Sequence, residues 1–238
     1  MKPALDSGPR RFFATPRTSC PYLDDRLERK VFTELGGNEA ADLHDALATA
    51  GFRRSQNIVY KPLCDGCASC VAIRVRSLEF QPRRWMRRVT RCNADLVAES
   101  RPPVATQEQF ALFRRYLTWR HDDGGMADMN YAEYRSMVED TPIVTRLIEY
   151  RDSAGELQGG CLTDLMTDGL SLVYSFFAPE RNDKSPGSAI ILWHIDWARS
   201  LGLPFVYLGY WIAESPKMAY KIRFAPLEVL GREGWEQR

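Results

Sequence analysis

The second half of the sequence predicts a mixed α/β fold. Between residues 143 and 210, three strand-like runs are followed by a helical segment and a fourth strand. Strands interrupted by a helix in this order usually pair into one mixed sheet. The chain has 238 residues, 45% of them hydrophobic, which is enough for one large domain or two small, closely packed ones.

The first hundred residues predict a smaller set of elements. Residues 38–50 show a helical spacing of apolar side chains, and Gly51 stands where a helix usually ends. Residues 52–61 and 71–76 alternate in the manner of strands. Residues 83–96 indicate a basic helix.

The elements of the second half follow a pair of prolines, Pro102 and Pro103, which exclude a helix and favour an extended link. We therefore expect a boundary between regions 1–101 and 102–238. The expected elements after it are an amphipathic helix at 107–120, a short helix at 131–138, strands at 143–150, 157–165 and 170–177, a helix at 186–201 and a strand at 204–210.

Charge is divided unevenly between these two regions. Residues 1–101 hold 18 Lys or Arg and 12 Asp or Glu, a balance of +6, whereas residues 102–238 have a balance of −5. A basic half can meet a polyanion although the whole chain carries only +1. An ordinary fluctuation in composition would give the same numbers.

Composition also limits the class of protein. No run approaches the roughly 18 apolar residues of a membrane span, and the first 18 residues lack the apolar stretch of a signal peptide. Six cysteines are too few for a disulfide scaffold in a chain of this length. We expect a cytoplasmic protein without a membrane partner.

The start of the helix at 186–201 is the first candidate binding site. The run from Lys184 through Gly187 to Ala189 resembles the phosphate-binding turn of GNAT-type acetyltransferases. Exposed backbone N–H groups and the helix dipole make such a turn an anion site. A plain helix start, with Ser185 as cap and Pro186 in the first turn, explains the same residues.

Aromatic and basic residues gather further along the chain. Tyr207, Gly209 and Tyr210 end the last predicted strand, and Lys217, Tyr220 and Lys221 follow without a clear helical period. Aromatic rings that stack bases, beside lysines that meet phosphates, suit a single-stranded nucleic-acid end.

With these features the sequence resembles the bacterial aminoacyl-tRNA–protein transferases, the aspartate/glutamate leucyltransferases that are related to eukaryotic arginyl-tRNA–protein transferases. The blocks that carry the resemblance span nearly the whole chain. They are CPYL at 20–23, ERKVFTEL at 28–35, FRRSQNI at 52–58, CDGCASC at 64–70, RH at 120–121 with GGMAD at 124–128, GLSLVYSFF at 169–177, YLGYW at 207–211 and KMAYKIRFAP at 217–226.

The resemblance implies a small N-terminal α/β region packed on a GNAT-like acyltransferase domain. It implies transfer of leucine from leucyl-tRNA to proteins that begin with Asp or Glu, which marks them for adaptor-guided proteolysis. No cofactor is then required, since aminoacyl-tRNA is the co-substrate. Relatives often have Arg-Ser-Leu-Gly where this chain has Lys184-Ser185-Pro186-Gly187.

The expected chemistry needs no covalent nucleophile, because the donor ester is already activated and a protein α-amine is partly neutral near pH 7. Asp164 and His121 are the two side chains that we expect as general base. The ribose hydroxyl of the tRNA is a third candidate, and an exposed loop position explains His121 equally well.

Arginines are the expected ligands of the acceptor's acidic side chain, since a guanidinium holds a carboxylate through two hydrogen bonds. The candidates are Arg53, Arg54 and Arg120. Neighbours in a strand face opposite ways, so only one of the first two should point into a pocket. The plainer alternative makes all three surface ion-pair partners.

The tRNA would meet two further groups of residues. Arg84, Arg87, Arg88 and Arg91 share one side of the helix predicted at 83–96, where they could contact acceptor-stem phosphates; a solvated helix face is the usual alternative. The expected contacts with the aminoacyl end are Tyr174, Lys184, Gly187, Tyr207, Gly209, Tyr210, Lys217, Tyr220 and Lys221.

The cysteines leave a metal site open. Cys64, Cys67 and Cys70 have ligand-like spacing, and Cys20 is a conceivable fourth ligand. Zinc or an iron–sulfur cluster needs four such ligands, whereas reduced thiols packing a tight turn need none. We commit to no metal.

Three alternatives compete with leucyl transfer. Arginyl-tRNA could be the donor, because the choice of amino acid depends on the shape and charge of a pocket. A coenzyme A-dependent acetyltransferase would use the same helix start for a different phosphate. An RNA-binding module without activity would keep the aromatic and basic residues alone.

Overall fold

The computed structural model describes residues 10–120 and 128–238 of the chain. Its N-terminal region contains a four-stranded sheet in the order β1-β4-β6-β5, with α1 beside it and a separate two-stranded ribbon. The elements are β1 (Phe13–Ala14), β2 (Thr18–Ser19), β3 (Leu27–Glu28), β4 (Lys30–Glu34), α1 (Ala40–Thr49), β5 (Arg53–Ser55) and β6 (Ile58–Pro62).

A larger sheet of eight strands forms the rest of the molecule, in the order β14-β13-β7-β12-β11-β10-β9-β8. In this sheet β11 and β12 pair in parallel, and the other neighbours are antiparallel. The strands are β7 (Val71–Arg76), β8 (Val97–Arg101), β9 (Thr145–Arg151), β10 (Leu157–Leu165), β11 (Gly169–Phe177), β12 (Phe205–Trp211), β13 (Leu227–Leu230) and β14 (Trp235–Gln237).

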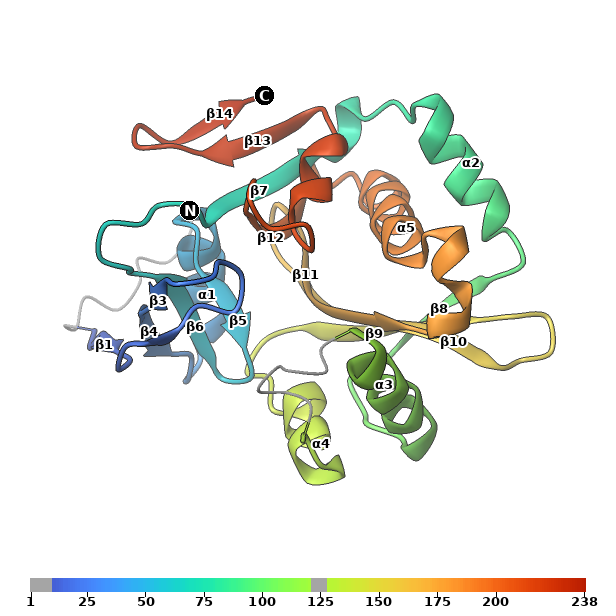
Figure 1. Cartoon of the computed structure of the whole chain (residues 1–238), viewed down its shortest axis with the longest axis horizontal. Helices are drawn as coiled ribbons and strands as arrows, with labels where there is room; N and C mark the ends of the chain where they lie inside the picture. The colour runs from blue at the N-terminus through green and yellow to red at the C-terminus, as the bar shows by residue number, and fades with distance from the viewer. Residues whose placement is uncertain (1–9, 121–127) are drawn as a thin grey trace.

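Helices cover both faces of this sheet (Figure 1). α2 (Arg84–Cys92) and α5 (Pro186–Ser200) lie on one face, while α3 (Gln107–Arg120) and α4 (Tyr131–Glu139) lie on the other. Three short 3-10 helices complete the described elements: η1 (Ser77–Glu79), η2 (Pro179–Lys184) and η3 (Ala219–Arg223).

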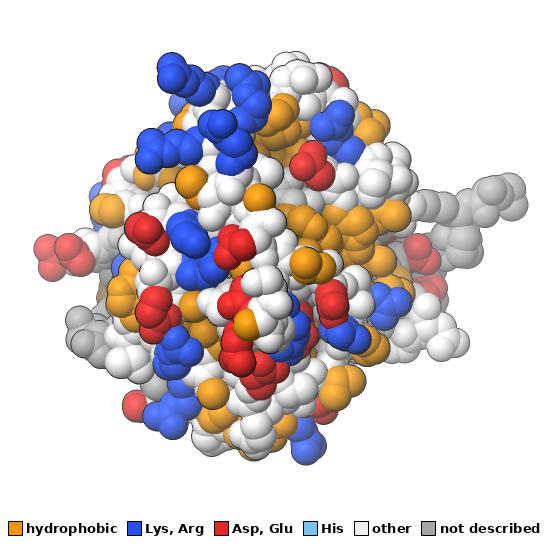
Figure 2. Space-filling model, turned by 90° about the vertical axis from the view of Figure 1, so that its right-hand side faces the viewer, with side chains coloured by type: hydrophobic (Ala, Val, Ile, Leu, Met, Phe, Trp, Pro, Cys, Tyr) orange, Lys and Arg blue, Asp and Glu red, His pale blue; other side chains and the backbone are white. Residues whose placement is uncertain are grey.

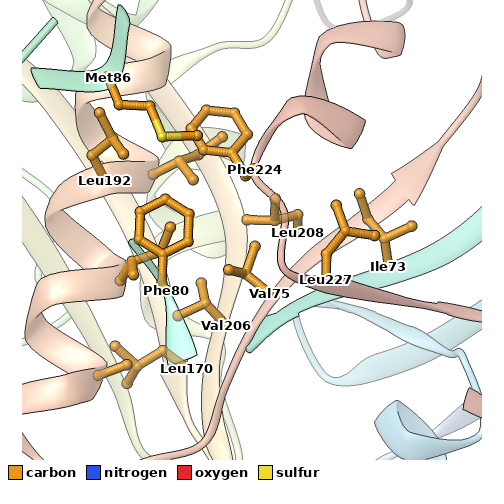
Figure 3. Packing of buried hydrophobic residues seen from close by; sticks show 13 residues of the cluster. Ile73, Val75, Phe80, Met86, Leu170, Leu192, Val206, Leu208, Phe224 and Leu227 are labelled. Carbon is orange, nitrogen blue, oxygen red and sulfur yellow. The ribbon is translucent and has the colours of Figure 1, made fainter. Parts of the chain in front are cut away.

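The main core lies under α5. Figure 3 shows Phe80, Leu192 and Phe224 meeting between the helices and the central strands. Leu170 and Val206 come from the parallel pair β11 and β12, and both are fully buried. This packing fixes the two strands where they run side by side, and removal of such apolar surface from water is the main stabilising term in folding.

The structure confirms the predicted mixed α+β class. α3 and β10 have the predicted bounds, and the helix expected at 186–201 is α5. The helix expected at 83–96 is shorter and ends at Cys92, because Asn93 leaves the helical conformation.

One predicted strand was wrong. Residues 52–61 form a hairpin of β5 and β6 rather than one strand, because Gln56 takes a φ of 53° and reverses the chain. β8, β13 and β14 were not expected, and β4 occupies residues for which we expected only a lead into the first helix.

The expected boundary at residues 101/102 falls at the end of β8, inside the large sheet. β7 from the first hundred residues pairs with β12 and β13 from the last forty. Segments from both ends of the chain thus build the centre of the sheet. Within the described residues, no helix is both long and apolar enough to cross a membrane.

Candidate active site

The candidate site lies where β11 and β12 separate. Their parallel ladder joins Gly169–Ser171 to Phe205–Tyr207 and goes no further. Beyond it, the pairing of β11 with β10 passes over Val173, and β12 has an irregular register at Gly209, whose φ is 72°. Carbonyl groups on these facing edges have no strand partner, and buried carbonyls need a donor from elsewhere.

Arg53 supplies the donor on the β11 side. Its Nη2 donates to the carbonyl oxygens of Leu172 at 3.0 Å and Val173 at 2.9 Å. The guanidinium also passes against Gly209, where a Cβ atom would overlap it, and lies 5.9 Å from the centre of the Tyr210 ring. The hairpin of β5 and β6 therefore inserts one arginine between the separated strands.

Lys221 supplies the donor on the β12 side. Its Nζ donates to the carbonyl oxygens of Leu208 at 2.9 Å and Tyr210 at 3.0 Å. Burial, and secondly the nearby Arg53 guanidinium, hold the pKa of Lys221 well below its ordinary value. In the described part of the chain, neither cation forms a salt bridge with an acidic side chain.

Three buried or half-buried tyrosines belong to the segments that carry Lys221 or the carbonyl partners of Arg53 and Lys221: Tyr174 on β11, Tyr210 on β12 and Tyr220 on η3. Burial raises the pKa of Tyr220 to about 12 and raises the pKa values of Tyr174 and Tyr210 further. Two further side chains act on the pKa values of both Tyr174 and Tyr220: the phenol of Tyr116 raises them and the charge of Arg120 lowers them. All of these phenols stay neutral at physiological pH. Tyr210 is only 4% exposed, so the half-buried Tyr174 and Tyr220 are the two candidates for stacking on a base.

Arg54 and Asp164, which we expected in acceptor binding and catalysis, are bound to each other. Arg54 Nε donates to Asp164 Oδ2 at 2.7 Å and Arg54 Nη2 to Oδ1 at 2.6 Å. Thr145 adds a hydrogen bond of 2.9 Å, and His44 Nε2 lies 3.6 Å away. Asp164 is 0% exposed. Both oxygens of this carboxylate are engaged by Arg54, and one also accepts from Thr145, so Asp164 would have to give up part of the ion pair to accept a substrate proton.

The prediction that only one of the two adjacent arginines enters a pocket agrees with this arrangement. Arg53 is half-buried at the separated strands, whereas Arg54 is buried on the other side of β5. Arg120 is half-buried at the end of α3, and its charge acts on the phenols of Tyr116, Tyr174 and Tyr220. His121 lies outside the described residues.

Of two other predicted tRNA contacts, Tyr207 is buried and Lys217 is exposed. Tyr207 is 6% exposed, accepts from Arg74 at 2.9 Å and donates to Asp168 at 2.9 Å. It belongs to a cluster with Trp235 and does not join the tyrosines of the site. Lys217 is exposed, in the loop before η3.

The helix start that we expected to bind phosphate has an unusual conformation. Ser185 has a φ of 55° and does not cap α5 through its side chain. Lys184 is half-buried, with its carbonyl accepting from Asn93 Nδ2 at 2.8 Å. Gly187 faces Phe177 at ordinary contact distance.

The arginines of α2 form an exposed basic face. Arg84, Arg87, Arg88 and Arg91 are all exposed, and none forms a salt bridge within residues 10–120 and 128–238. Three of them line a groove of about 470 Å³ beside Asp196. Figure 2 shows Lys and Arg side chains gathered at the top of the face that carries this helix.

The cysteines converge as the spacing suggested. Cys20, Cys64, Cys67 and Cys70 line one small pocket of about 60 Å³ together with Tyr22. Burial, followed by the neighbouring thiols, raises the pKa of Cys70 to about 12. Among the described residues, no three His, Cys, Asp or Glu side chains are arranged to hold an ion.

Sequence reasoning missed part of the site. Tyr22 and Tyr116 act electrostatically on Tyr174, yet they stand more than 50 residues from it. Tyr60 and Lys30 line the cysteine pocket beside Tyr210. The only signal for Tyr22 was its place in the CPYL block, because contacts this distant in sequence leave no local pattern.

Family comparisons cover almost the whole chain. Residues 18–88 match the family described as arginine-tRNA-protein transferase, N terminus, and residues 108–231 match its C-terminal counterpart. An aspartate/glutamate leucyltransferase of Paramagnetospirillum magneticum is 51% identical, over 96% of this chain and 94% of the relative. One of Afipia carboxidovorans is 54% identical, over 94% and 92%.

Solved structures are more distant. L-PGS from Bacillus licheniformis has a TM-score of 0.49 at 12% identity, and this chain covers 52% of its length with 75% of its own. FemX has a TM-score of 0.45 at 12% identity, with 76% of this chain and 62% of that one covered. Likenesses of this size carry no functional argument.

Proposed function

The chain belongs to the arginine-tRNA–protein transferase family, and from that premise we propose that it transfers leucine from leucyl-tRNA to the α-amine of proteins beginning with Asp or Glu. Relatives at 51% and 54% identity are named for this activity. The structural observation that supports it is the end of the ladder between β11 and β12, where Arg53 and Lys221 meet without an acidic partner among the described residues.

The opening suits an acyl transfer between two bound substrates. The ester bond of an aminoacyl-tRNA is already activated, so the enzyme has to position the amine and stabilise the oxyanion that forms. Cations held by backbone carbonyls in a poorly hydrated site act strongly on such a charge. No side chain has to form a covalent intermediate.

Arg53 is our candidate for recognising the acceptor. One of its terminal nitrogens is occupied by the carbonyls of Leu172 and Val173, and the remaining N–H groups are available for the acidic side chain. A fixed guanidinium attracts the carboxylate of Asp or Glu by its charge and by a single hydrogen bond from Nη1 or Nε, and it gives no equivalent interaction to an apolar residue. Arg120, which influences the same tyrosines, is the second candidate.

The donor tRNA would use the tyrosines and the basic helix. Tyr174 and Tyr220 offer neutral rings for the terminal adenine. Lys184 and the exposed arginines of α2 would contact phosphates of the acceptor stem. These contacts read backbone charge and leave the choice of amino acid to the opening itself.

The product would carry a new N-terminal leucine. We propose that this residue marks the protein for adaptor-guided proteolysis in the cytoplasm, which makes the enzyme a step of an N-degron pathway. The substrates are then defined by one exposed residue, and the recognising site can be as small as the opening around Arg53.

A direct transfer assay tests the function. Purified protein is incubated with [³H]leucyl-tRNA and peptides that begin with Asp, Glu or Ala, and with an Asp peptide whose amine is acetylated. We expect label on the free Asp and Glu peptides only. Absence of label from both, with the leucyl ester intact, would refute the proposal.

Arginine is the second candidate donor, because the matching family description names arginine-tRNA. Arginyl-tRNA in the same assay separates the two: transfer of arginine but not leucine would replace the proposed donor. Acetyl-CoA in place of tRNA tests the acetyltransferase alternative.

A further inference from the structure

Lys221 stands out among the buried ionisable groups. It is 8% exposed, and its Nζ forms two hydrogen bonds of 2.9 and 3.0 Å to the carbonyls of Leu208 and Tyr210. No salt bridge neutralises it in the parts of the chain that the structure describes. A buried lysine with only carbonyl partners needs an explanation.

The number of partners suggests the protonation state. An ammonium has three N–H donors, and here the third would have no acceptor among the described residues. A neutral amine has two N–H groups and one lone pair. Its two hydrogens would satisfy Leu208 and Tyr210, and the lone pair would be fixed in the remaining tetrahedral direction.

The surrounding charges favour the neutral amine. Arg53 on β5 is the charged group that acts on Lys221, and a like charge disfavours a second cation. On β12, the phenol of Tyr210 donates to the carbonyls of Gly51 and Tyr60, and burial raises its pKa so that it stays protonated. On η3 itself, burial raises the pKa of Tyr220 to about 12, so that it adds no negative charge.

We propose that Lys221 is the general base of the transfer, accepting at its Nζ the proton that the acceptor amine loses. This assignment rests on the proposed function. It differs from our expectation for Asp164, whose oxygens are fully enclosed by Arg54 and Thr145. Arg53 cannot take this role, because a guanidinium stays protonated in proteins.

The reaction balances without another reactant. The acceptor nitrogen forms a bond to the ester carbon, and its surplus proton moves to Lys221 Nζ. The bond between that carbon and the ribose 3′ oxygen then breaks, and the proton passes from Nζ to the departing oxygen. Between these two proton transfers Lys221 is an ammonium. It then places a second cation next to the oxyanion of the tetrahedral intermediate.

Substitutions of Lys221 distinguish a general base from a residue that only holds the strands through its hydrogen bonds. We expect Lys221→Met to lower kcat by about 100-fold or more, the usual effect of losing a general base, and to change KM for leucyl-tRNA much less. Lys221→Arg keeps a cation and its donors but cannot release a proton, so it should lose kcat similarly. Lys61→Met, at a lysine of β6 whose Nζ also donates to a backbone carbonyl, that of Ala50, is the control and should match the wild type.

Restoration of kcat by Lys221→Arg would overturn the proposal, since charge alone would then suffice. So would a Lys221→Met protein that remains folded, by circular dichroism, and transfers leucine at the wild-type rate. The pH profile of kcat with both substrates saturating should lose its acidic limb in folded variants at this position.

A titration that needs no activity provides the second readout. The full chain has six lysines, and ¹³C labelling at their ε carbons allows each to be followed by NMR, with the Lys221 signal assigned from Lys221→Arg. We expect the Lys221 signal to titrate well below the ordinary range of a lysine side chain.

The results of these experiments distinguish failure of the proposed function from failure of the proposed role of Lys221. Wild-type transfer combined with a Lys221 signal that titrates together with the other lysines would refute the base assignment and leave the function standing. Failure of wild-type transfer with every aminoacyl-tRNA would refute the function, and the base assignment with it.

Discussion

At the scale of single residues, the site depends on two basic side chains whose hydrogen bonds replace missing strand pairing. Arg53 and Lys221 each donate to two carbonyls where β11 and β12 part. The same hydrogen bonds that stabilise the separated strands therefore hold these two side chains in place. A side chain fixed in this way needs little reorganisation when charge develops on a substrate.

Gly209 gives a residue-scale prediction. Its φ is 72°, and a Cβ atom there would overlap the Arg53 guanidinium. We expect Gly209→Ala to displace Arg53 and to lower kcat/KM for the acceptor peptide by about 10-fold or more, measured in the leucyl-transfer assay. The positive φ adds a backbone penalty of about 1–2 kcal/mol.

Gly202 supplies the matched control. It has a φ of 69°, but the space that a Cβ atom would occupy there is open. Gly202→Ala should share the loss of thermal stability and keep the transfer rate. Equal activity in both variants would show that Arg53 does not depend on the space at Gly209.

At the scale of elements, α2 provides a surface for binding tRNA that lies apart from the proposed catalytic residues. Its arginines are exposed and lie along the groove beside Asp196, outside the opening between β11 and β12. The helix contributes Met86 to the core and leaves its charged side to solvent. An exposed row of cations without acidic partners among the described residues suits a polyanion.

Neutralising part of this row should weaken tRNA binding alone. We expect the double variant Arg84→Gln, Arg91→Gln to raise Kd for tRNA and to reduce the slope of log Kd against log salt concentration by up to about 2, since each phosphate contact contributes about 0.9. Fluorescence anisotropy with labelled tRNA at several salt concentrations measures this, while kcat at saturation should stay near the wild-type value.

The control for this element is a pair of arginines on the opposite face of the sheet. Arg114 on α3 and Arg135 on α4 are both exposed, and their replacement by Gln removes the same net charge. An equal loss of affinity in both double variants would assign the effect to overall charge instead of α2.

At the scale of the whole molecule, the two sheets are joined by a buried ion pair. Arg54 on the small sheet and Asp164 on the large one are both fully buried side chains, bound through two hydrogen bonds. His44 on α1 lies against the same carboxylate. The pair ties the hairpin that carries Arg53 to the large sheet, while Arg53 itself is held by its own hydrogen bonds to Leu172 and Val173.

Breaking this pair should destabilise the protein as a whole. We expect Asp164→Asn to lower the free energy of unfolding in urea by about 3–5 kcal/mol, because it leaves a buried guanidinium without its counter-charge. In conditions where the variant is folded, its kcat should remain within several-fold of the wild type. A loss of about 100-fold in a folded variant, the usual effect of removing a general base, would restore Asp164 as a catalytic candidate.

Glu180→Gln provides the comparison, since it removes an exposed ion pair with Arg115. Surface pairs contribute at most about 1 kcal/mol. If the two substitutions change the free energy of unfolding equally, the pair between the sheets has no special weight.

Local sequence signals were enough to predict the class of fold, most of the long elements and the family. The apolar spacing of α3, and the prolines and glycines that bound the helices, are local signals, so they could be read without the structure. The family blocks pointed to Arg53 and Lys221, which the structure brings together where β11 and β12 part.

The surroundings of each residue could be learned only from the fold. Arg53 and Arg54 are adjacent and chemically identical, yet one enters the opening and the other is held by Asp164. That difference comes from the turn at Gln56 and from the packing of two sheets, which no local pattern records. Lys221 likewise became a candidate base only through the fold, because the carbonyls that take up its two hydrogens belong to a separate strand.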